Sequence, residues 1–559
     1  MERYWLKNYP AGVPAEIDAD AYRSIPHLFA ESVEKYADRT AYIWRGSGLS
    51  FAAVDRLSRD LAAWLQSRGL TKGTRIALMM PNVLQYPVAI FGALRAGCII
   101  VNVNPLYTVH ELEYQLADSG AEAIIVLENF AATVEQAIAR RPLRHVVVAS
   151  LGDLVGLKGA LINLVVRRWK KLIPEWHIPD AVGFRSVLSD GSRLPLDPVD
   201  IGPDDIAFLQ YTGGTTGVSK GAILLHRNIL ANLSQVSAWF APAQRDNEPE
   251  ILVTPLPLYH SFALTANCLY QLKQGGTIIL ITNPRDIAGF VKELSREKFT
   301  AITGINTLYN ALLSHPDFSK IDFSRLRMAT AGGMAVQSAV AERWKNATGV
   351  AILEGYGLSE ASPVVTINPV NGHDGPANTI GLPLPSTAVT IRDDAGQILP
   401  VGEVGEICVS GPQVMQGYWN RPDETARVLT MDGALKTGDL GCMDERGFVR
   451  IVDRKKDMIL VSGFNVYPTE IEDVVAKLPG VFECAVIGVA DQKSGEAPKL
   501  FVVRKDANLT EADIIAHCRQ YLTAYKIPRH VEFRDTLPKT NVGKILRRQL
   551  KEEASSLSG

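Results

Sequence analysis

Apolar runs of strand length alternate with helical stretches between residues 75 and 331. The first series has expected strands at 75–80, 98–104, 121–127 and 145–149, with helices at 84–96, 110–119 and 130–140. The second series has expected strands at 206–211, 251–255, 277–281, 299–305 and 327–331. Apolar strands that are joined by helices are typical of βαβ units and parallel sheets. The pattern predicts an α/β protein in which two such subdomains, after a helical lead-in over 1–45, form one large core.

The pattern changes near residue 381, where short alternating strands are separated by Gly and Pro turns. Such strands, at 388–392, 405–410 and 448–452, predict a small antiparallel sheet or β-barrel. A charged run at 453–456 then precedes an α+β tail, whose helix at 511–522 has a good N-cap residue in Thr510. We therefore predict three parts in the chain: an N-terminal domain over 1–452 that ends in the β-barrel of about 381–452, a hinge at 453–456, and a smaller mobile C-terminal domain over 457–559.

Composition excludes several classes of protein. A chain of 559 residues is too long for one core, and 47% apolar with 21% charged residues is typical of globular proteins. A net charge of −2 argues against binding nucleic acid through bulk charge. The six cysteines form no CxxC pair, which suits a reducing compartment and gives no zinc motif. Without a signal-peptide pattern or a bilayer-length apolar run, we expect a cytoplasmic protein.

The segment 151–173 combines apolar and basic residues. Leucines and Trp169 recur among Lys158, Arg167, Arg168, Lys170 and Lys171. A basic amphipathic helix with a tryptophan can lie on an anionic membrane, here the inner membrane. The alternative is a helix that packs on its own domain and turns its charges to water.

The run 211–221 reads Tyr-Thr-Gly-Gly-Thr-Thr-Gly-Val-Ser-Lys-Gly and lies between an expected strand and an expected helix at 226–233. Its backbone N–H groups, hydroxyls and lysine can surround one anion, and glycine lets the backbone approach a phosphate closely. Its spacing differs from that of the nucleotide P-loop, because Val218 and Ser219 separate Gly217 from Lys220. A plain connecting loop is the alternative.

Other polar clusters lie at strand ends or turns, namely 257–260, 331–334, 354–360, 436–439, 453–456, 463–470 and 538–544. Each is a weak signal by itself. In this order, across most of the chain, they resemble the acyl-adenylate-forming superfamily of acyl-CoA synthetases, luciferases and peptide-synthetase adenylation domains. The run 432–468 is most similar to the bacterial long-chain fatty-acid–CoA ligases.

The resemblance implies two half-reactions. A fatty carboxylate attacks the α-phosphate of ATP to give acyl-AMP and pyrophosphate, and the thiol of CoA then displaces AMP. Because the nucleophile belongs to the substrate, the protein must supply positioning and charge neutralisation at the phosphoryl oxygens. The implied partners are fatty acid, ATP with Mg²⁺, and CoA; the sequence leaves a homodimer open.

The resemblance also implies residue roles. The catalytic set is Lys544, Glu360, His260 and Thr212, of which Glu360 and Thr212 would hold Mg²⁺. The nucleotide would be bound by Tyr211, Thr212, Gly213, Gly214, Thr215, Thr216, Gly217, Lys220, Gly355, Tyr356, Gly357, Ser359, Asp439 and Arg454. His260, Gly332, Gly333 and Gly463 would line the acyl and CoA channel. Lys455 and Lys456 would form the hinge about which the C-terminal domain turns between the two half-reactions.

Three positions depart from the family pattern. Ser359 stands where threonine is commoner, Ala434 where tryptophan usually precedes the Thr-Gly-Asp motif, and Leu460 where luciferases and aryl ligases have lysine. The last favours the fatty-acyl group. The alternatives are an acyl-AMP ligase that delivers to a carrier protein, a medium-chain or aryl-CoA ligase, and a non-enzymatic fatty-acid binder. Retention of Lys544, Glu360 and Asp439 argues against the binder, which needs no adenylation lysine.

Overall fold

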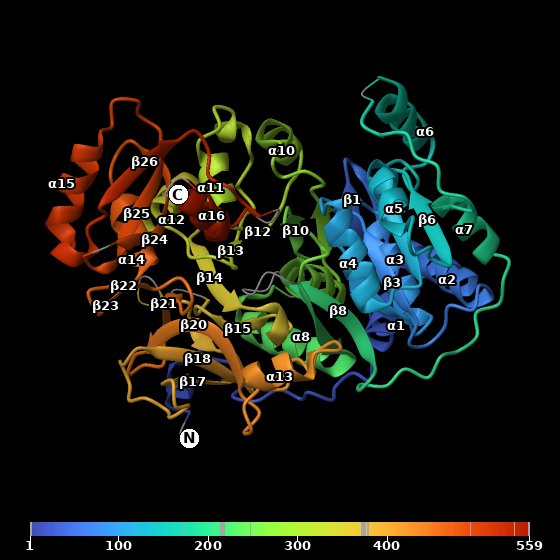
Figure 1. Ribbon diagram of the computed structural model, residues 1–559. Helices are drawn as coiled ribbons and strands as arrows, with labels where there is room; N and C mark the ends of the chain where they lie inside the picture. Colours follow the sequence, from blue (N-terminus) through green and yellow to red (C-terminus); the bar gives the residue numbers. More distant parts are fainter. Residues whose placement is uncertain are drawn as a thin grey trace.

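The structure is a computed structural model that describes residues 3–169, 171–212, 219–245, 248–370, 376, 379–491, 493–540 and 543–556. Two large sheets with their helices form most of the molecule, and a smaller antiparallel sheet and a C-terminal α+β unit complete it (Figure 1). The predicted α/β class is confirmed.

The first large sheet has the order β19-β9-β8-β4-β3-β5-β6-β7. Its pairings are parallel except at β8–β9 and β9–β19. Its strands are β3 (Arg75–Met79), β4 (Ile99–Asn102), β5 (Ala123–Leu127), β6 (His145–Ala149), β7 (Val182–Gly183), β8 (Ile206–Thr212), β9 (Lys220–Leu225) and β19 (Gly417–Tyr418). The helices of this part of the chain are α2 (Phe51–Ser67), α3 (Gln85–Arg95), α4 (Val109–Ser119), α5 (Ala131–Ile138), α6 (Leu157–Leu164) and α7 (Phe184–Gly191).

The second large sheet has the order β16-β15-β14-β13-β12-β10-β11-β1-β2. Its strands are β1 (Thr40–Trp44), β2 (Ser47–Ser50), β10 (Ile251–Thr254), β11 (Thr277–Leu280), β12 (Ala301–Gly304), β13 (Met328–Ala331), β14 (Ile352–Gly357), β15 (Val364–Ile367) and β16 (Leu382–Pro383). The helices of this part are α1 (Ile25–Tyr36), α8 (His226–Phe240), α9 (Tyr270–Gln274), α10 (Ile287–Leu294), α11 (Asn306–Leu313) and α12 (Ser338–Thr348).

Three expectations about these sheets are wrong. The pattern of apolar runs predicts that the strand at 206–211 belongs to the second series, but β8 pairs with β4 and β9 in the first sheet. The sequence predicts a strand-to-helix junction at 211–221, but this run joins the antiparallel strands β8 and β9, and α8 begins only after β9. The lead-in is not helical throughout, because β1 occupies Thr40–Trp44 and pairs in parallel with β11.

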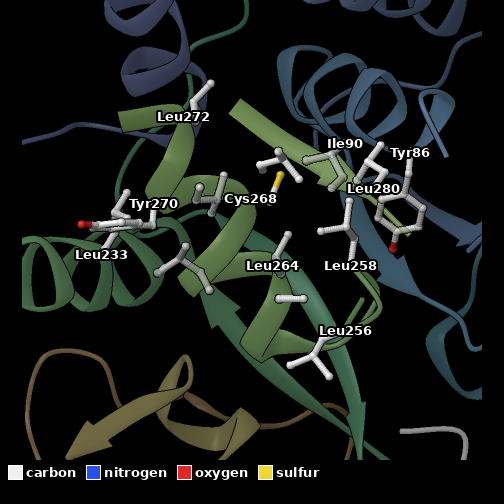
Figure 2. Packing of buried hydrophobic residues seen from close by; sticks show 14 of the residues in the cluster. Tyr86, Ile90, Leu233, Leu256, Leu258, Leu264, Cys268, Tyr270, Leu272 and Leu280 are labelled. Carbon is white, nitrogen blue, oxygen red and sulfur yellow. The ribbon is translucent and has the colours of Figure 1, made fainter. Parts of the chain in front are cut away.

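One hydrophobic cluster joins both large sheets, which confirms the predicted common core. Figure 2 shows part of it: Tyr86 and Ile90 of α3 point toward Leu258, Leu264 and Leu280, which belong to the part of the chain between β10 and the end of β11. Cys268 lies on a π-helical turn, η5 (Ala263–Leu269), inside this cluster. Burial of apolar side chains at about 25 cal/mol per Å² makes such a core the main stabilising term of the fold.

The remaining strands form two smaller units. The antiparallel sheet β17-β18-β20-β21 comprises β17 (Ala388–Arg392), β18 (Gly405–Ser410), β20 (Leu435–Met443) and β21 (Val449–Arg454), and α13 (Pro422–Val428) lies between β19 and β20 in the chain. The C-terminal unit has β22 (Ile459–Val461), β23 (Phe464–Val466), β24 (Val481–Asp491), β25 (Gly495–Arg504) and β26 (His530–Arg534), with α14 (Pro468–Val475), α15 (Glu511–Tyr521) and α16 (Arg547–Ser556).

The C-terminal unit has hydrophobic clusters of its own. Its helix α15 begins as predicted, since the Thr510 hydroxyl accepts from the backbone N–H of Asp513 at 3.2 Å. Strand β21 runs to Arg454, so the first two residues of the predicted hinge 453–456 belong to a strand. Within the described ranges, no helix is long and apolar enough to cross a membrane.

Candidate active site

The β8–β9 hairpin carries the phosphate-type loop. Thr212 and Lys220 are register partners at its two ends, and the Ser219 hydroxyl donates to the Thr212 carbonyl at 2.9 Å. At the base, the Tyr211 hydroxyl donates to Asp118 at 2.7 Å. The predicted residues Gly213, Gly214, Thr215, Thr216 and Gly217 lie outside the described residues. The hairpin therefore fixes both ends of the loop at the edge where β8 ends.

Glu360 lies beside the end of β8, although the two are far apart in the chain. Its Oε1 is 3.4 Å from the Thr212 hydroxyl, and the neighbouring Ser359 hydroxyl lies 2.9 Å from that of Ser261. A carboxylate and a hydroxyl are the hard oxygen ligands that Mg²⁺ prefers, and this cation commonly takes one or two protein ligands and substrate phosphates. The described residues contain no group of three or more acidic, His or Cys side chains that could hold a metal, so the donor set fits a cation shared with a phosphate rather than a closed protein site.

Asp439 joins three elements. It is the register partner of Arg454 in the β20–β21 pair, and Nε of Arg454 donates to its Oδ1 at 3.0 Å. The Tyr356 hydroxyl, from β14 of the second large sheet, donates to its Oδ2 at 2.7 Å. Burial and the adjacent Asp439 charge raise the pKa of Tyr356, which keeps its phenol a donor. Gly355 and Gly357 flank Tyr356 on β14, so the predicted adenine and ribose residues lie together.

Lys544 reaches from the C-terminal unit to the end of β13. Gly333, at φ +83°, lies next to it: a Cβ built there would be 3.4 Å from Cε of Lys544. The Lys544 ammonium also interacts electrostatically with Arg454, Asp439 and Glu360. Burial and the nearby Arg454 charge lower its pKa, while the two carboxylates act in the opposite sense. One lysine therefore interacts electrostatically with the predicted cation ligand Glu360 and with the predicted ribose residue Asp439.

His260 and Gly332 lie on the acyl side of this group. The His260 Nδ1 accepts from the backbone N–H of Phe262 at 3.4 Å. Burial, reinforced by the Lys544 charge, lowers the pKa of His260 to about 4, so the ring is neutral at neutral pH. A Cβ at Gly332 would be 3.1 Å from the Phe262 ring, so glycine leaves room for that ring.

The predicted hinge residues Lys455 and Lys456 and the predicted channel residue Gly463 have surroundings different from those of Lys544. Lys455 forms ion pairs with Asp394 at 2.6 Å and Glu406 at 3.2 Å, and burial lowers the pKa of Lys456. Gly463 lies at φ +85° between the paired strands β22 and β23, and a Cβ there would have no heavy atom within 4 Å. The structure thus brings Lys544 to the site but leaves the Gly463 turn open.

Sequence reasoning missed a group of residues that surrounds the hairpin. The Tyr418 hydroxyl donates to Glu360, Lys220 pairs with Glu424, and Arg421 pairs with Asp118. Three of these residues, Tyr418, Arg421 and Glu424, come from 418–424, a run of aromatic and charged residues that follows the predicted small-sheet strand 405–410. The aromatic and charged residues concentrated in this run could have indicated a functional role from the sequence alone.

Comparison with known proteins agrees with the superfamily that the sequence resembles. Two family models match, the AMP-binding enzyme over residues 29–419 and the AMP-binding enzyme C-terminal domain over 470–544. The chain is 57% identical over 557 residues to a long-chain-fatty-acid–CoA ligase of Yersinia pestis, covering 99% of this chain and 98% of that protein. It is 39% identical to that of Bacillus subtilis (strain 168), covering 99% and 98%. The crystal structure of the anthranilate CoA ligase AuaEII in complex with anthranoyl-AMP superposes with a TM-score of 0.86 at 27% identity, covering 97% and 99%.

Proposed function

The chain belongs to the AMP-binding enzyme family and joins long-chain fatty acids to CoA through an acyl-AMP, and from that premise we propose which of its residues do the work. ATP and CoA are its co-substrates. The observation that carries the proposal is the position of Lys544, a residue of the C-terminal unit whose Cε lies beside Gly333 and whose ammonium interacts electrostatically with Asp439 and Glu360.

Lys544 bridges the fatty carboxylate and the α-phosphate during adenylation. A cation at this point stabilises the negative charge that develops as the carboxylate oxygen attacks phosphorus and pyrophosphate leaves. Asp439 and Glu360 interact favourably with the Lys544 ammonium, while burial and the Arg454 charge act in the opposite sense. In the proposed role the lysine contributes positive charge and positioning at the reacting oxygens.

Glu360 and Thr212 hold Mg²⁺, and the loop 212–220 with Lys220 embraces the pyrophosphate portion of ATP. The cation, when bound, neutralises phosphoryl oxygens. Support comes from the 3.4 Å approach of the Thr212 hydroxyl to the Glu360 carboxylate, and from the glycine and hydroxyl content of the loop. Tyr211 and Ser359 support these groups from the adjoining strand and turn.

Asp439 accepts from the ribose hydroxyls, Arg454 contacts the same sugar, and Gly355, Tyr356 and Gly357 line the adenine. An ionised carboxylate is a strong acceptor, and the two donors already on Asp439 fix its orientation. His260, neutral at working pH, places the fatty carboxylate without adding positive charge, while Gly332 and Gly333 let the acyl group pass close to the backbone.

The C-terminal domain, 457–559, turns about the hinge 453–456 after adenylation, carrying Lys544 away and bringing Gly463 to the pantetheine channel. Separate hydrophobic clusters support movement as a unit. Lys455 would exchange its ion pairs with Asp394 and Glu406 during the rotation, while Lys456 supplies the second hinge position.

The test separates the two half-reactions. Lys544→Ala should reduce palmitate-dependent ATP–pyrophosphate exchange by at least a hundredfold, because a charge made for the transition state is lost. It should leave CoA transfer from supplied palmitoyl-AMP nearly intact. Lys539→Ala is the matched control. Lys539 lies in the same run, 538–544, as Lys544, but it forms an ion pair with Glu483 of the C-terminal unit. Unchanged exchange in Lys544→Ala would overturn the assignment.

Product analysis tests the alternatives within the superfamily. We expect palmitoyl-CoA and AMP from palmitate, Mg·ATP and CoA. Accumulated acyl-AMP that CoA does not discharge would favour delivery to a carrier protein. Higher kcat/KM for octanoate or an aryl acid than for palmitate would favour a medium-chain or aryl-CoA ligase.

The segment 151–173 docks on an anionic membrane surface. In α6 and the π-helical turn that follows, η3 (Val165–Trp169), apolar side chains face solvent: Leu157 is 96% exposed and Trp169 84%. Exposed Arg168 and Lys171 lie beside them, which gives the combination of apolar and basic groups that anionic lipid attracts. Figure 1 shows α6 at the rim of the molecule. We place the enzyme in the cytoplasm, peripheral on the inner membrane; a homodimer stays a prediction for light scattering.

A further inference from the structure

The segment 415–424 attaches to the phosphate-loop hairpin from outside. As edge strand β19 it pairs with β9, with the N–H of Gln416 donating to the Ile223 carbonyl at 3.1 Å and that of Trp419 to the Gly221 carbonyl at 2.8 Å. Just before it, the N–H of Met415 donates to the backbone carbonyl of Glu360 at 2.8 Å. One short segment therefore holds both the hairpin and the turn that carries Glu360.

Tyr418 connects two charged groups of the site. Its hydroxyl donates to Oε1 of Glu360 at 2.8 Å, and its ring lies 5.5 Å from the Nζ of Lys220. Its own backbone is fixed, because the N–H of Tyr418 donates to the Thr425 hydroxyl at 2.8 Å. Gly417 permits this packing, since a Cβ there would be 2.8 Å from Cγ2 of Thr425.

The contacts on Glu360 distinguish its two oxygens. The Tyr418 and Thr212 hydroxyls both approach Oε1. Among the described residues, Oε2 accepts no hydrogen bond. A phenol carries its proton at neutral pH and an ionised carboxylate only accepts, so Tyr418 is the donor in this hydrogen bond.

We propose that Tyr418 is a positioning residue that holds Oε1 of Glu360 and thereby presents Oε2 to the Mg²⁺ of Mg·ATP. The proposal rests on the proposed role of Glu360 as the cation ligand. A hydrogen bond to a metal-binding carboxylate fixes its rotation, and loss of such partners commonly costs 10–100-fold in metal affinity. Because the Tyr418 ring also lies against Lys220, the same side chain sets the spacing between cation ligand and phosphate-loop lysine.

The test variant is Tyr418→Phe, which removes the hydroxyl and keeps the ring beside Lys220. Binding of Mn²⁺ in the presence of non-hydrolysable α,β-methylene-ATP, followed by electron paramagnetic resonance, should weaken roughly tenfold. The Mg²⁺ concentration that half-saturates ATP–pyrophosphate exchange should rise by a similar factor. The exchange rate at saturating Mg²⁺ and the KM for palmitate should stay near the wild-type values, which a general structural defect would not permit.

Tyr9→Phe is the matched control, because the Tyr9 hydroxyl also makes one part-buried hydrogen bond, to the Pro383 carbonyl, outside the site. Glu360→Gln separates the two hypotheses. If it leaves Mn²⁺ binding unchanged, the proposed role of Glu360 fails. If it weakens binding while Tyr418→Phe does not, the positioning role of Tyr418 is overturned. A double variant no weaker than Glu360→Gln supports the proposal, and additive losses would contradict it.

Discussion

Tyr356 and Asp439 belong to different sheets, yet the Tyr356 hydroxyl donates to Oδ2 of Asp439 at 2.7 Å. The other oxygen, Oδ1, accepts from Arg454 at 3.0 Å. Asp439 is buried, with 6% of its surface exposed, so its charge depends on these two donors. The contact fastens the small antiparallel sheet to the second large sheet at the point where we place the ribose.

Asp439→Ala should therefore weaken ATP binding by roughly 10- to 100-fold, since a charged hydrogen bond is worth about 1.5–3 kcal/mol. Calorimetric titration of ATP measures this directly. Asp432→Ala is the matched control, because Asp432 also pairs with an arginine of the small sheet, Arg392, at 2.7 Å but is largely exposed. If both variants bind ATP equally well, Asp439 does not hold the ribose.

Gly333→Ala should impair adenylation through Lys544. A residue with a Cβ at φ +83° costs about 1–2 kcal/mol, and the new methyl group would lie at van der Waals distance, 3.4 Å, from Cε of Lys544, where it would restrict the movement of that side chain. Gly349→Ala has a similar φ of +77° and no heavy atom within 4 Å, so it reproduces the backbone strain without the contact. We expect both variants to lose thermal stability, but only Gly333→Ala to lose about tenfold in ATP–pyrophosphate exchange. Equal rates would show that Lys544 tolerates the methyl group.

The elements were more predictable than their arrangement. Periodicity located the strands of both series, but the placement of β8 in the first sheet depends on pairing with β4, which spacing along the chain does not encode. The signal for β1 was present in the run Thr-Ala-Tyr-Ile-Trp at Thr40–Trp44, rich in β-branched and aromatic residues. The role of Tyr418 could not be predicted from the sequence, because its partner Glu360 lies 58 residues earlier in the chain and only the folded edge strand brings the two together.

His226 should make the protein less stable in mild acid. Burial lowers its pKa from 6.5 to about 4, with Asp205 acting in the opposite sense, and its Nδ1 accepts from the backbone N–H of Ile25 at 3.2 Å. Between pH 6.5 and about 4, His226 is protonated in the unfolded chain but neutral in the folded protein. The free energy of unfolding therefore falls as the pH drops from 6.5 toward 4. The shift corresponds to about 3 kcal/mol at the acid end.

Scanning calorimetry at pH 7 and pH 5 measures this effect. His226→Asn keeps an acceptor near the Nδ1 position without the titration, so its unfolding temperature should fall less between the two pH values than that of the wild type. His110→Asn, at an exposed histidine, should behave as the wild type does. An unaltered pH dependence in His226→Asn would place the acid sensitivity elsewhere.

Membrane docking through 151–173 should depend on Arg168 and Lys171. Two other basic residues of the segment, Arg167 and Lys170, are left out of the test. Arg167 donates to Glu128 at 2.8 Å and to Ser150 at 3.0 Å, so it serves the fold and is left unchanged. Lys170 lies outside the described residues. Each basic group near an anionic surface contributes about 1 kcal/mol, so the variant Arg168→Glu/Lys171→Glu should bind phosphatidylglycerol vesicles at least tenfold more weakly.

Two comparisons make the membrane test specific. Trp169→Ser should also weaken binding to these vesicles, because an 84% exposed indole would lose its apolar insertion. Charge reversal at Lys345 and Arg519, which are exposed on α12 and α15, changes net charge by the same amount and should leave binding nearly unchanged. Because net charge is matched, a loss confined to the 151–173 variants must come from that surface. Equal binding by all variants would mean that α6 and η3 do not contact lipid.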